Sequence, residues 1–163
     1  MPAEGPTLLD RSKQGSKSPL WRSQLFEQYK LYVASAHKVS DRRATANNYM
    51  LTVNSAMAAL YGMTSQSSGS AAWSIVFPGA GILMSLVWWR LLVSYRALNS
   101  VKFAIIQDLE RCLPAAPYTY EWHLTKRAGK AYRPLSHLEY LVPFIFMALY
   151  AVLIAFPILG WHK

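Results

Sequence analysis

The stretch AAWSIVFPGAGILMSLVWWR, residues 71–90, decides the fold, because 19 uncharged residues in succession precede the charge of Arg90. At about 1.5 Å of rise per residue, a helix of this length spans roughly the hydrocarbon core of a bilayer. Trp88 and Trp89 stand directly before the arginine, and tryptophan favours the headgroup zone of a membrane. We therefore predict a membrane-spanning helix over 71–89. Arg90 marks its cytoplasmic boundary, where the long side chain reaches water or phosphate.

The composition of the chain also favours a membrane protein. Of 163 residues, 53% are hydrophobic and 15% are charged, whereas soluble domains carry about 25% charged residues. The length fits one domain or one membrane bundle. The single cysteine, Cys112, excludes an internal disulfide framework and a cysteine-rich metal site.

Two more stretches have the length of a membrane span. Residues 49–65 carry no charge, and residues 138–160 are strongly apolar. Ser136 and Glu139 have the spacing of a capping box at the start of the latter. The short polar turn SQSSGS, residues 65–70, predicts that the first two spans are antiparallel. The predicted fold class is an all-α integral membrane bundle with about three membrane helices per subunit.

Amphipathic helices are predicted outside the spans. Within 20–45, apolar residues recur three or four positions apart, which places them on one face of a helix: Leu25, Tyr29, Tyr32, Ala36 and Val39. After the second span, an apolar stripe continues toward Pro114 and includes Leu91, Tyr95, Leu98, Ile105 and Leu109. Because neither stripe is stable alone in water, we predict that the cytoplasmic helix 20–45 packs on a long cytoplasmic extension of the second span. A helix lying in the lipid interface is the alternative for 20–45.

The chain divides into three predicted parts. Residues 1–19 mix Pro, Gly, Ser and Lys without an apolar face, which predicts a disordered tail. Residues 20–45 form the cytoplasmic helix. Residues 46–160 form the membrane domain, which includes the helical extension and a loop within 90–136. From Pro114 the loop is rich in turn formers, aromatic residues and bases, so we expect an extended segment with one turn of helix.

The distribution of charge predicts the topology. Eight Lys and Arg residues lie within 1–43, none within 44–89 and eight within 90–133, and Lys163 ends the chain. The positive-inside rule places both basic blocks, and with them the N-terminus, in the cytoplasm. Three spans then place the C-terminus outside. The short basic loop fits anionic lipid headgroups better than a nucleic acid, so membrane lipids are expected partners and nucleic acid is not.

Two groups of residues are candidate contact sites. Candidates for lipid or cytoplasmic-boundary contacts are Arg42, Arg43, Trp88, Trp89, Arg90 and Arg96. For the two arginines before the first span, the favoured role is to determine topology. The alternatives are an ion pair with Asp108 or Glu110 and contact with an acidic lipid. Candidates for an oligomer or pore face lie on one small and polar side of the first span: Asn48, Thr52, Ser55, Ala59 and Gly62.

No local catalytic signature is present in the sequence. The four histidines show no HExxH pattern, and the chain has neither a Gly-rich phosphate loop nor a GxSxG motif. No acidic residue lies inside a predicted span away from its ends, which argues against a proton-coupled transporter. We therefore predict a non-enzymatic protein with no metal and no cofactor.

Three blocks of sequence resemble a known family. They are EQYKLYVASAHKVSDRRATANNYMLTVNSA (27–56), WWRLLVSYRALNSVKFAIIQDLERCLPAAPYTYEW (88–122) and PLSHLEYLVPFIF (134–146). The blocks are similar to the bacterial RipA-type octameric membrane protein family, a group of small proteins of the cytoplasmic membrane. The resemblance implies a homo-oligomer of nominally eight subunits in the bacterial inner membrane. It also implies helix contacts or boundary positions for residues 40–43, Asn47, Arg90, Arg96, Asn99 and Lys102.

Three functions remain as hypotheses. The leading one is a ring-like homo-oligomer with a scaffolding role or a role in membrane stress, because the resemblance includes proteins linked to bacterial fitness inside host cells. The second is a channel or pore-forming effector, with the polar face of the first span lining the path. The third is a membrane protein that binds anionic lipids through Arg90, Arg96 and the bases of the loop.

Overall fold

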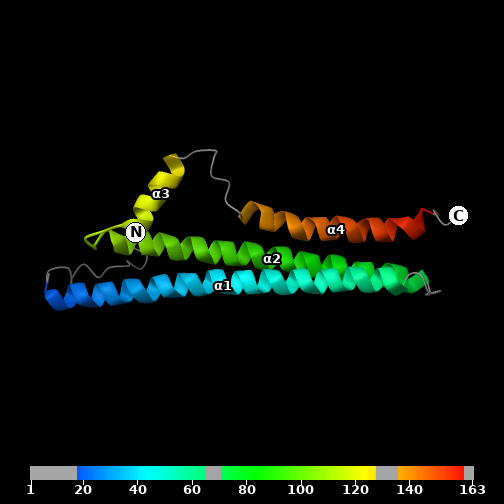
Figure 1. Ribbon diagram of the computed structural model, residues 1–163, viewed down its shortest axis with the longest axis horizontal. Coiled ribbons are helices and arrows are strands. Elements are labelled where there is room, and N and C mark those ends of the chain that lie inside the picture. The colour runs from blue at the N-terminus through cyan, green and yellow to red at the C-terminus, as the bar shows by residue number, and fades with distance from the viewer. Residues whose placement is uncertain (1–17, 65–70, 128–135, 160–163) are drawn as a thin grey trace, which may run out of the picture. The chain divides into compact units, whose positions relative to one another are not determined.

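Helices make up the regular structure of the chain. The computed structural model describes residues 18–64, 71–127 and 136–159. Within these ranges every regular element is an α-helix: α1 Pro19–Thr64, α2 Ala71–Glu110, α3 Pro117–Arg127 and α4 Ser136–Ile158 (Figure 1). The all-α prediction is therefore confirmed for the described residues. The predicted tail up to residue 17 and the predicted turn at 65–70 lie outside them.

Helix α1 runs without interruption for 46 residues, where the sequence analysis placed a cytoplasmic helix and a separate span. The Ser18 hydroxyl accepts a hydrogen bond of 3.2 Å from the Trp21 N–H, so Ser18 caps the start of the helix. Pro19 takes the first helical position, where its missing N–H costs nothing. Between Pro19 and Gly62 the chain has no glycine or proline, so no residue favours a break. The two predicted segments consequently form one continuous helix.

Helix α2 has 40 residues and continues well past Arg90, as the apolar stripe predicts. It ends shortly before Pro114. In its last turn the Cys112 N–H donates to the Leu109 carbonyl at 3.0 Å, and the Leu113 N–H donates to the Glu110 carbonyl at 3.0 Å. These bonds join residues three positions apart, whereas α-helical bonds join residues four apart, so the chain tightens into a turn.

Helix α3 corrects the prediction of an extended loop with one helical turn. It has 11 residues, which is about three turns. Pro117 begins the helix at the position where proline is most favoured. In the sequence, this proline and the aromatic residues after it resemble the composition of a loop. The contact that stabilises the helix start comes from a residue outside α3 and is described below.

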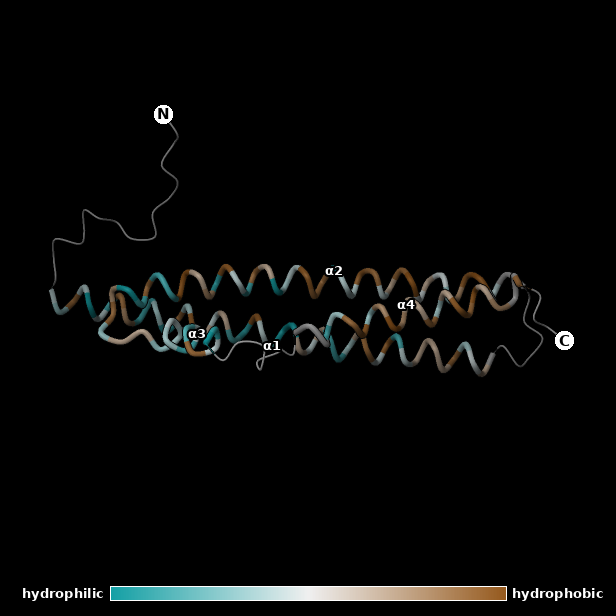
Figure 2. Tube along the Cα trace, turned by 90° about the horizontal axis from the view of Figure 1, so that it is seen from above, coloured by the Kyte–Doolittle hydropathy of each residue, from teal (hydrophilic) through white to brown (hydrophobic). Residues whose placement is uncertain are grey.

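Among the described residues, two helices are long and apolar enough to cross a membrane, over Trp73–Glu110 and Glu139–Phe156. Figure 2 shows the hydrophobic residues that dominate α4 and recur along α2. The predicted first span is 49–65, and its described part, 49–64, belongs to α1. This part is not one of the two candidates, because its Asn, Thr, Ser and Gly residues lower its mean hydropathy. Two candidate spans are thus found, and the third remains a prediction.

The helices form two compact units. Unit 1 combines Met1–Ser40 with Ala97–Tyr132, and unit 2 combines Asp41–Arg96 with Arg133–Lys163. In unit 1 the first part of α1 contacts the last part of α2, and α3 packs on α2. In unit 2 the second part of α1, the first part of α2 and α4 contact one another through the side chains described below.

Each unit has a small core. The buried hydrophobic residues of unit 1 are Leu25, Ala36, Val39, Ile106 and Leu109. Leu25, Ala36 and Val39 belong to the stripe predicted within 20–45, so that stripe faces α2 as predicted. Of the stripe predicted after the second span only Leu109 is buried, and Leu98 is 47% exposed, which corrects that part of the prediction. The core of unit 2 contains Met50, Trp88 and Leu92, against which Met84, Leu91, Tyr140, Val142 and Phe146 pack.

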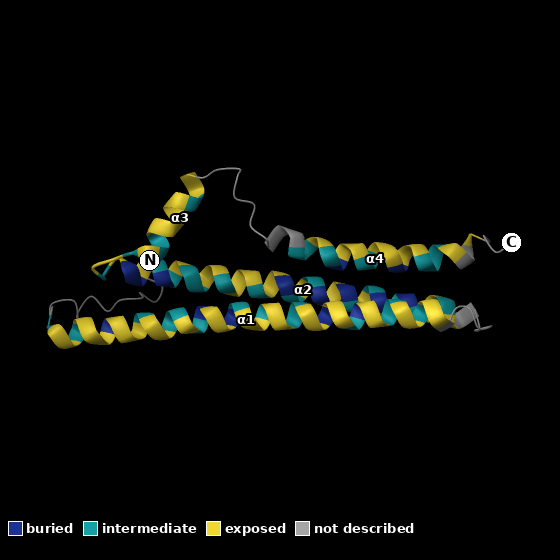
Figure 3. Ribbon diagram, in the orientation of Figure 1, coloured by how far each residue is buried: buried dark blue, intermediate teal, exposed yellow. Residues whose placement is uncertain are grey.

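Much apolar surface stays exposed on the described helices (Figure 3). Nine hydrophobic side chains are buried among the described residues, whereas 26 large ones are exposed. The exposed ones include Val76, Leu83, Phe144, Ile145 and Val152 in the two candidate spans. A soluble monomer rarely exposes contiguous apolar surface of this kind, so lipid or other protein must cover it.

Candidate functional site

Three fully buried polar side chains join the helices of unit 2. Asn54 of α1, Ser85 of α2 and Tyr150 of α4 are all 0% exposed. The Ser85 hydroxyl lies 3.1 Å from Asn54 Oδ1 and 2.9 Å from the Gly81 carbonyl oxygen, so its one proton is shared between these acceptors. The Tyr150 hydroxyl donates to the Asn54 carbonyl at 2.9 Å, and Asn54 Nδ2 donates to the Met50 carbonyl at 2.9 Å. These bonds fix the three helices along their axes, because a shift leaves a buried polar atom without a partner.

Gly81 allows α4 to approach α2 at this point. A Cβ atom on residue 81 would lie 2.5 Å from two ring carbons of Tyr150, which is too close for any real contact. The Tyr150 ring is fully buried and held by its hydroxyl bond, so it has little freedom to move away. The neighbouring Gly79 has open space around the same position. The two glycines therefore differ sharply in what they tolerate.

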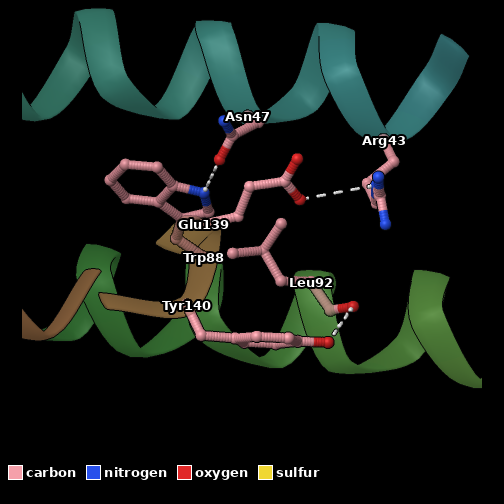
Figure 4. A network of polar contacts seen from close by, with 6 residues as sticks. All are labelled: Arg43, Asn47, Trp88, Leu92, Glu139 and Tyr140. Atoms are coloured by element: carbon pink, nitrogen blue, oxygen red, sulfur yellow. Dashed lines mark hydrogen bonds and ion pairs between the residues drawn. The ribbon is translucent and has the colours of Figure 1, made fainter. Parts of the chain in front are cut away.

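Trp88 forms the second contact between α1 and α2 in unit 2. Its indole N–H donates to Asn47 Oδ1 at 3.0 Å, and the side chain is 1% exposed. Figure 4 shows the indole nitrogen turned toward Asn47 on α1. The ring also meets Phe146 of α4, with the two centroids 6.1 Å apart and the planes tilted. Trp88 thus packs against both of its neighbouring helices.

An ion pair lies near the start of α4. Arg43 Nε of α1 is 3.6 Å from Glu139 Oε2 of α4, and both side chains are partly exposed (Figure 4). The sequence analysis considered Asp108 or Glu110 as the acidic partner of an arginine here, and the structure pairs Arg43 with Glu139 instead. The predicted capping box between Ser136 and Glu139 stays a prediction, because the side chain of Ser136 is outside the described part of the structure. Partial exposure limits the contribution of this pair to roughly 1 kcal/mol.

The predicted boundary residues fall into two sets. Arg42, Arg90 and Arg96 are exposed, and their contact with lipid headgroups stays a prediction. Trp88 differs from the expected headgroup contact, because its indole N–H finds Asn47 inside unit 2 and its ring is buried. Trp89 is only partly buried, so a contact with lipid stays a prediction for this residue.

The predicted oligomer or pore face of α1 is exposed. Its five residues are Asn48, Thr52, Ser55, Ala59 and Gly62, and each is exposed. Thr52 Oγ1 donates to the Asn48 carbonyl at 2.9 Å, within the helix. Asn54 of the same helix is fully buried and bonded to Ser85 of α2. The role of the five residues in an oligomer or a pore is not decided by these contacts and stays a prediction.

Glu110 joins the three helices of unit 1. This last residue of α2 is 1% exposed. Its carboxylate accepts the backbone N–H groups of Tyr118 and Thr119 at 2.9 and 2.8 Å and the Thr119 hydroxyl at 2.7 Å. The Tyr29 hydroxyl of α1 donates to the same carboxylate at 3.1 Å. Glu110 therefore caps the N-terminus of α3, where the helix dipole also favours a negative charge.

The contacts of Glu110 shift two pKa values. Burial raises the pKa of the carboxyl, but the hydrogen bonds from Thr119, Tyr118 and Tyr29 outweigh burial and hold the pKa below its ordinary value of 4.5. Burial and the bond to the Glu110 carboxylate raise the pKa of Tyr29 to about 12. Glu110 lies 20 residues beyond Arg90 and thus outside the predicted span. The carboxylate is consequently charged, and the phenol neutral, at neutral pH.

Sequence reasoning did not identify the role of Glu110. A local capping residue stands directly before the helix that it caps, whereas Glu110 precedes α3 by several residues and reaches it through a turn. The bond from Tyr29 is also nonlocal. The available signals were Pro117, which favours a helix start, and an acidic residue at the end of an apolar stripe.

Two further positions named by the resemblance, Asn99 and Lys102, lie on the part of α2 that belongs to unit 1. Lys102 Nζ donates to Ser35 Oγ at 2.6 Å and lies 4.9 Å from the centroid of the Tyr32 ring. Asn99 Oδ1 is buried and has no hydrogen-bond partner among the described residues. Lys102 therefore makes a helix contact, as expected from the resemblance. No cluster of three His, Cys, Asp or Glu residues suited to a metal occurs in the described part of the chain.

The octameric membrane protein family (8xMP) matches the chain over residues 26–159. Because this match covers most of the 163 residues, the chain belongs to that family. The resemblance noted in the sequence is thereby confirmed. Searches of curated proteins and of solved structures found no match. The family's description names an assembly in a membrane and no reaction.

We predict that Gly81→Ala destabilises the helical bundle and that Gly79→Ala does not. The Cβ at residue 81 meets the fixed Tyr150 ring, and overpacking of this kind costs about 1–3 kcal/mol. At residue 79 the space is open, and alanine favours a helix over glycine by up to about 1 kcal/mol. Thermal unfolding of the detergent-solubilised variants, followed by circular dichroism, measures both. Equal midpoints for the two variants would contradict the close approach of α2 and α4.

We predict that Glu110→Gln removes a pH-dependent part of the stability. The native pKa of Glu110 is depressed, so its contribution is complete above the unfolded pKa near 4.5 and is lost as the pH falls through the lower native value. Glutamine also weakens the charge-assisted bonds to α3, at a cost of roughly 1–3 kcal/mol at pH 7. Unfolding of wild type and variant between pH 7 and pH 3 should therefore converge at the acidic end. A constant difference across this range would show that the carboxylate does not titrate as described.

Proposed function

We propose that the chain is a non-enzymatic homo-oligomer of the bacterial inner membrane, with eight copies in a ring and a scaffolding role in membrane stress. The match to the octameric membrane protein family carries this proposal. The exposed apolar side chains of α2 and α4 support it, because they need lipid or further copies to cover them. The N-terminus lies in the cytoplasm, and the segment of α1 within 49–65 is the third span.

The small residues of α1 supply a contact between copies inside the membrane. Asn48, Thr52, Ser55 and Ala59 recur at helical spacing on one exposed side of α1. Small side chains allow two helices to approach closely in a membrane, and hydroxyl and amide groups add hydrogen bonds across the contact. The larger side chains of α4, such as Val152, face lipid.

Exposed arginines support contact with anionic lipids. Arg42 lies on α1 shortly before residue 49, and Arg90 follows the uncharged stretch of α2. Both side chains are exposed, and none of the described ion pairs includes them. A basic residue near the surface of an anionic leaflet gains about 1 kcal/mol. Anionic lipids of the cytoplasmic leaflet are accordingly the expected partners of these residues.

The assembly is tested by the mass of the purified protein. Native mass spectrometry from a mild detergent should give eight copies for wild type. Ser55→Trp should lower the octamer fraction several-fold, because a large ring replaces a small side chain at the proposed contact. Val152→Trp, on the proposed lipid face of α4, is the control and should remain octameric. A monomeric wild type would overturn the proposed function.

A channel is the second candidate, because the exposed face of α1 that carries Asn48, Thr52 and Ser55 is polar. In a ring, such a face can line a water-filled path. This candidate predicts ion flux through liposomes that contain the wild-type protein and a clear change in that flux for Ser55→Trp. Liposomes that are electrically silent with intact octamers would exclude the channel and leave the scaffold.

A further inference from the structure

Unit 1 exposes a mixed face on α1, where Leu31 and Ala34 stand among charged residues that include Lys38. With about 100° between successive helix residues, Leu31 and Ala34 lie on the side of α1 opposite the buried residues Leu25 and Ala36. Leu31 is 70% exposed. Glu27 and Lys30, which form an exposed ion pair of 2.6 Å, adjoin this side. We call these four residues, Glu27, Lys30, Leu31 and Ala34, the α1 outer face.

A second exposed face lies on the opposite side of the helix pair. The residues Ala97, Val101 and Ala104 of α2 are exposed and point away from the buried Ile106 and Glu110, which face α1 and α3. Val101 is 57% exposed. The exposed ion pair of Asp108 and Arg111, at 3.3 Å, continues the same side. We call the five residues Ala97, Val101, Ala104, Asp108 and Arg111 the α2 outer face.

Contacts within unit 1 fix which residues of the two helices are level. Tyr29 bonds Glu110, and Ser35 bonds Lys102, so the helices run antiparallel. Because both are α-helices with the same rise per residue, each residue further along α1 lies level with about one residue earlier in α2. This register places Ala34 level with Ala104.

The same register brings opposite charges to the same level. Glu27 is level with Arg111, and Lys30 is level with Asp108. Each ion pair is closed within its own helix and is well exposed, with side chains 50% to 80% accessible. The two outer faces consequently carry opposite charges at matching levels, beside a few exposed apolar residues. Within one chain they point away from each other and cannot meet.

We propose that the α2 outer face of one copy packs on the α1 outer face of the next copy and so closes the ring outside the membrane. This inference rests on the proposed homo-oligomer. Rotation about an axis parallel to the helices keeps every residue at its level, so the register within one copy also holds between copies. A contact between two different faces of the same chain is the type that generates a ring.

A second copy fits these faces better than lipid does. Both faces carry pairs of opposite charges beside their apolar residues, whereas a lipid-facing surface is uniformly apolar. The small Ala34 and Ala104 share one level, which lets the two helices approach closely there. Helix α3 occupies another side of α2, where Tyr118 meets Phe103 with ring centroids 5.8 Å apart. Both outer faces stay open for a neighbouring copy.

Disulfide cross-linking in native membranes tests the contact. In a Cys112→Ser parent, which has no other cysteine, the pair Ala34→Cys and Ala104→Cys should form disulfides between copies under mild oxidation. Because each copy then joins two neighbours, a ladder of bands up to eight copies is expected on a non-reducing gel. Each single variant is the control and should stay free of a ladder.

The outcomes of cross-linking separate the two proposals. An octameric parent whose double variant gives no ladder would overturn the contact between outer faces and leave the proposed function intact. A disulfide that closes within one copy would also overturn it, because the two faces would then be adjacent. A monomeric parent would overturn the proposed function and this contact together.

Charge exchange tests the register independently. Glu27→Lys with Lys30→Glu keeps the ion pair within α1, and Asp108→Arg with Arg111→Asp keeps the one within α2. Each exchange alone should lower the octamer fraction several-fold, because like charges then meet between copies. The fourfold variant should recover the wild-type fraction. A fourfold variant no better than either double variant would contradict the register.

Discussion

The chain has more apolar surface than its helices can bury against one another, and this constraint governs the structure. A helix pair has only one contact side on each helix, yet α2 carries hydrophobic residues on several sides along its 40 residues. The stretch before Arg90 has the length and composition of a membrane span, and in our proposal lipid covers its exposed apolar residues. Beyond Arg90 the charges return while apolar residues such as Val101 stay exposed, and in our proposal a neighbouring copy covers them.

Polar contacts determine how the helices are aligned, because apolar contacts alone allow sliding. In unit 2 the bonds of Asn54, Ser85 and Tyr150 fix the position of each helix along its axis relative to the other two. In unit 1 the Glu110 carboxylate has the same effect and binds both Tyr29 and the start of α3. A defined height is the property that a ring needs, because every copy must present its faces at the same level to the next.

The sequence predicted the helical class and the length of α2. It also predicted the apolar stripe of α1 that contacts α2, because the periodicity of apolar residues reports directly on buried faces. It divided α1 in two because charge density changes near residue 43, although no residue there breaks a helix. It assigned Trp88 to the headgroups, since a sequence shows the frequent role of tryptophan and not the nearby Asn47 acceptor. Helix α3 was missed because its capping carboxylate, Glu110, reaches it from another helix. In each case the deciding partner is distant in sequence.

Two residues of α2, Val87 at 51% and Val101 at 57%, are about equally exposed in one chain. Lipid should cover the first and a neighbouring copy the second. Power-saturation electron paramagnetic resonance of single nitroxide labels, in the cysteine-free protein in liposomes, measures this difference. The account predicts that oxygen but not a polar nickel complex relaxes the label at 87, and that neither relaxes the label at 101. Free access of the nickel complex to residue 101 would contradict it.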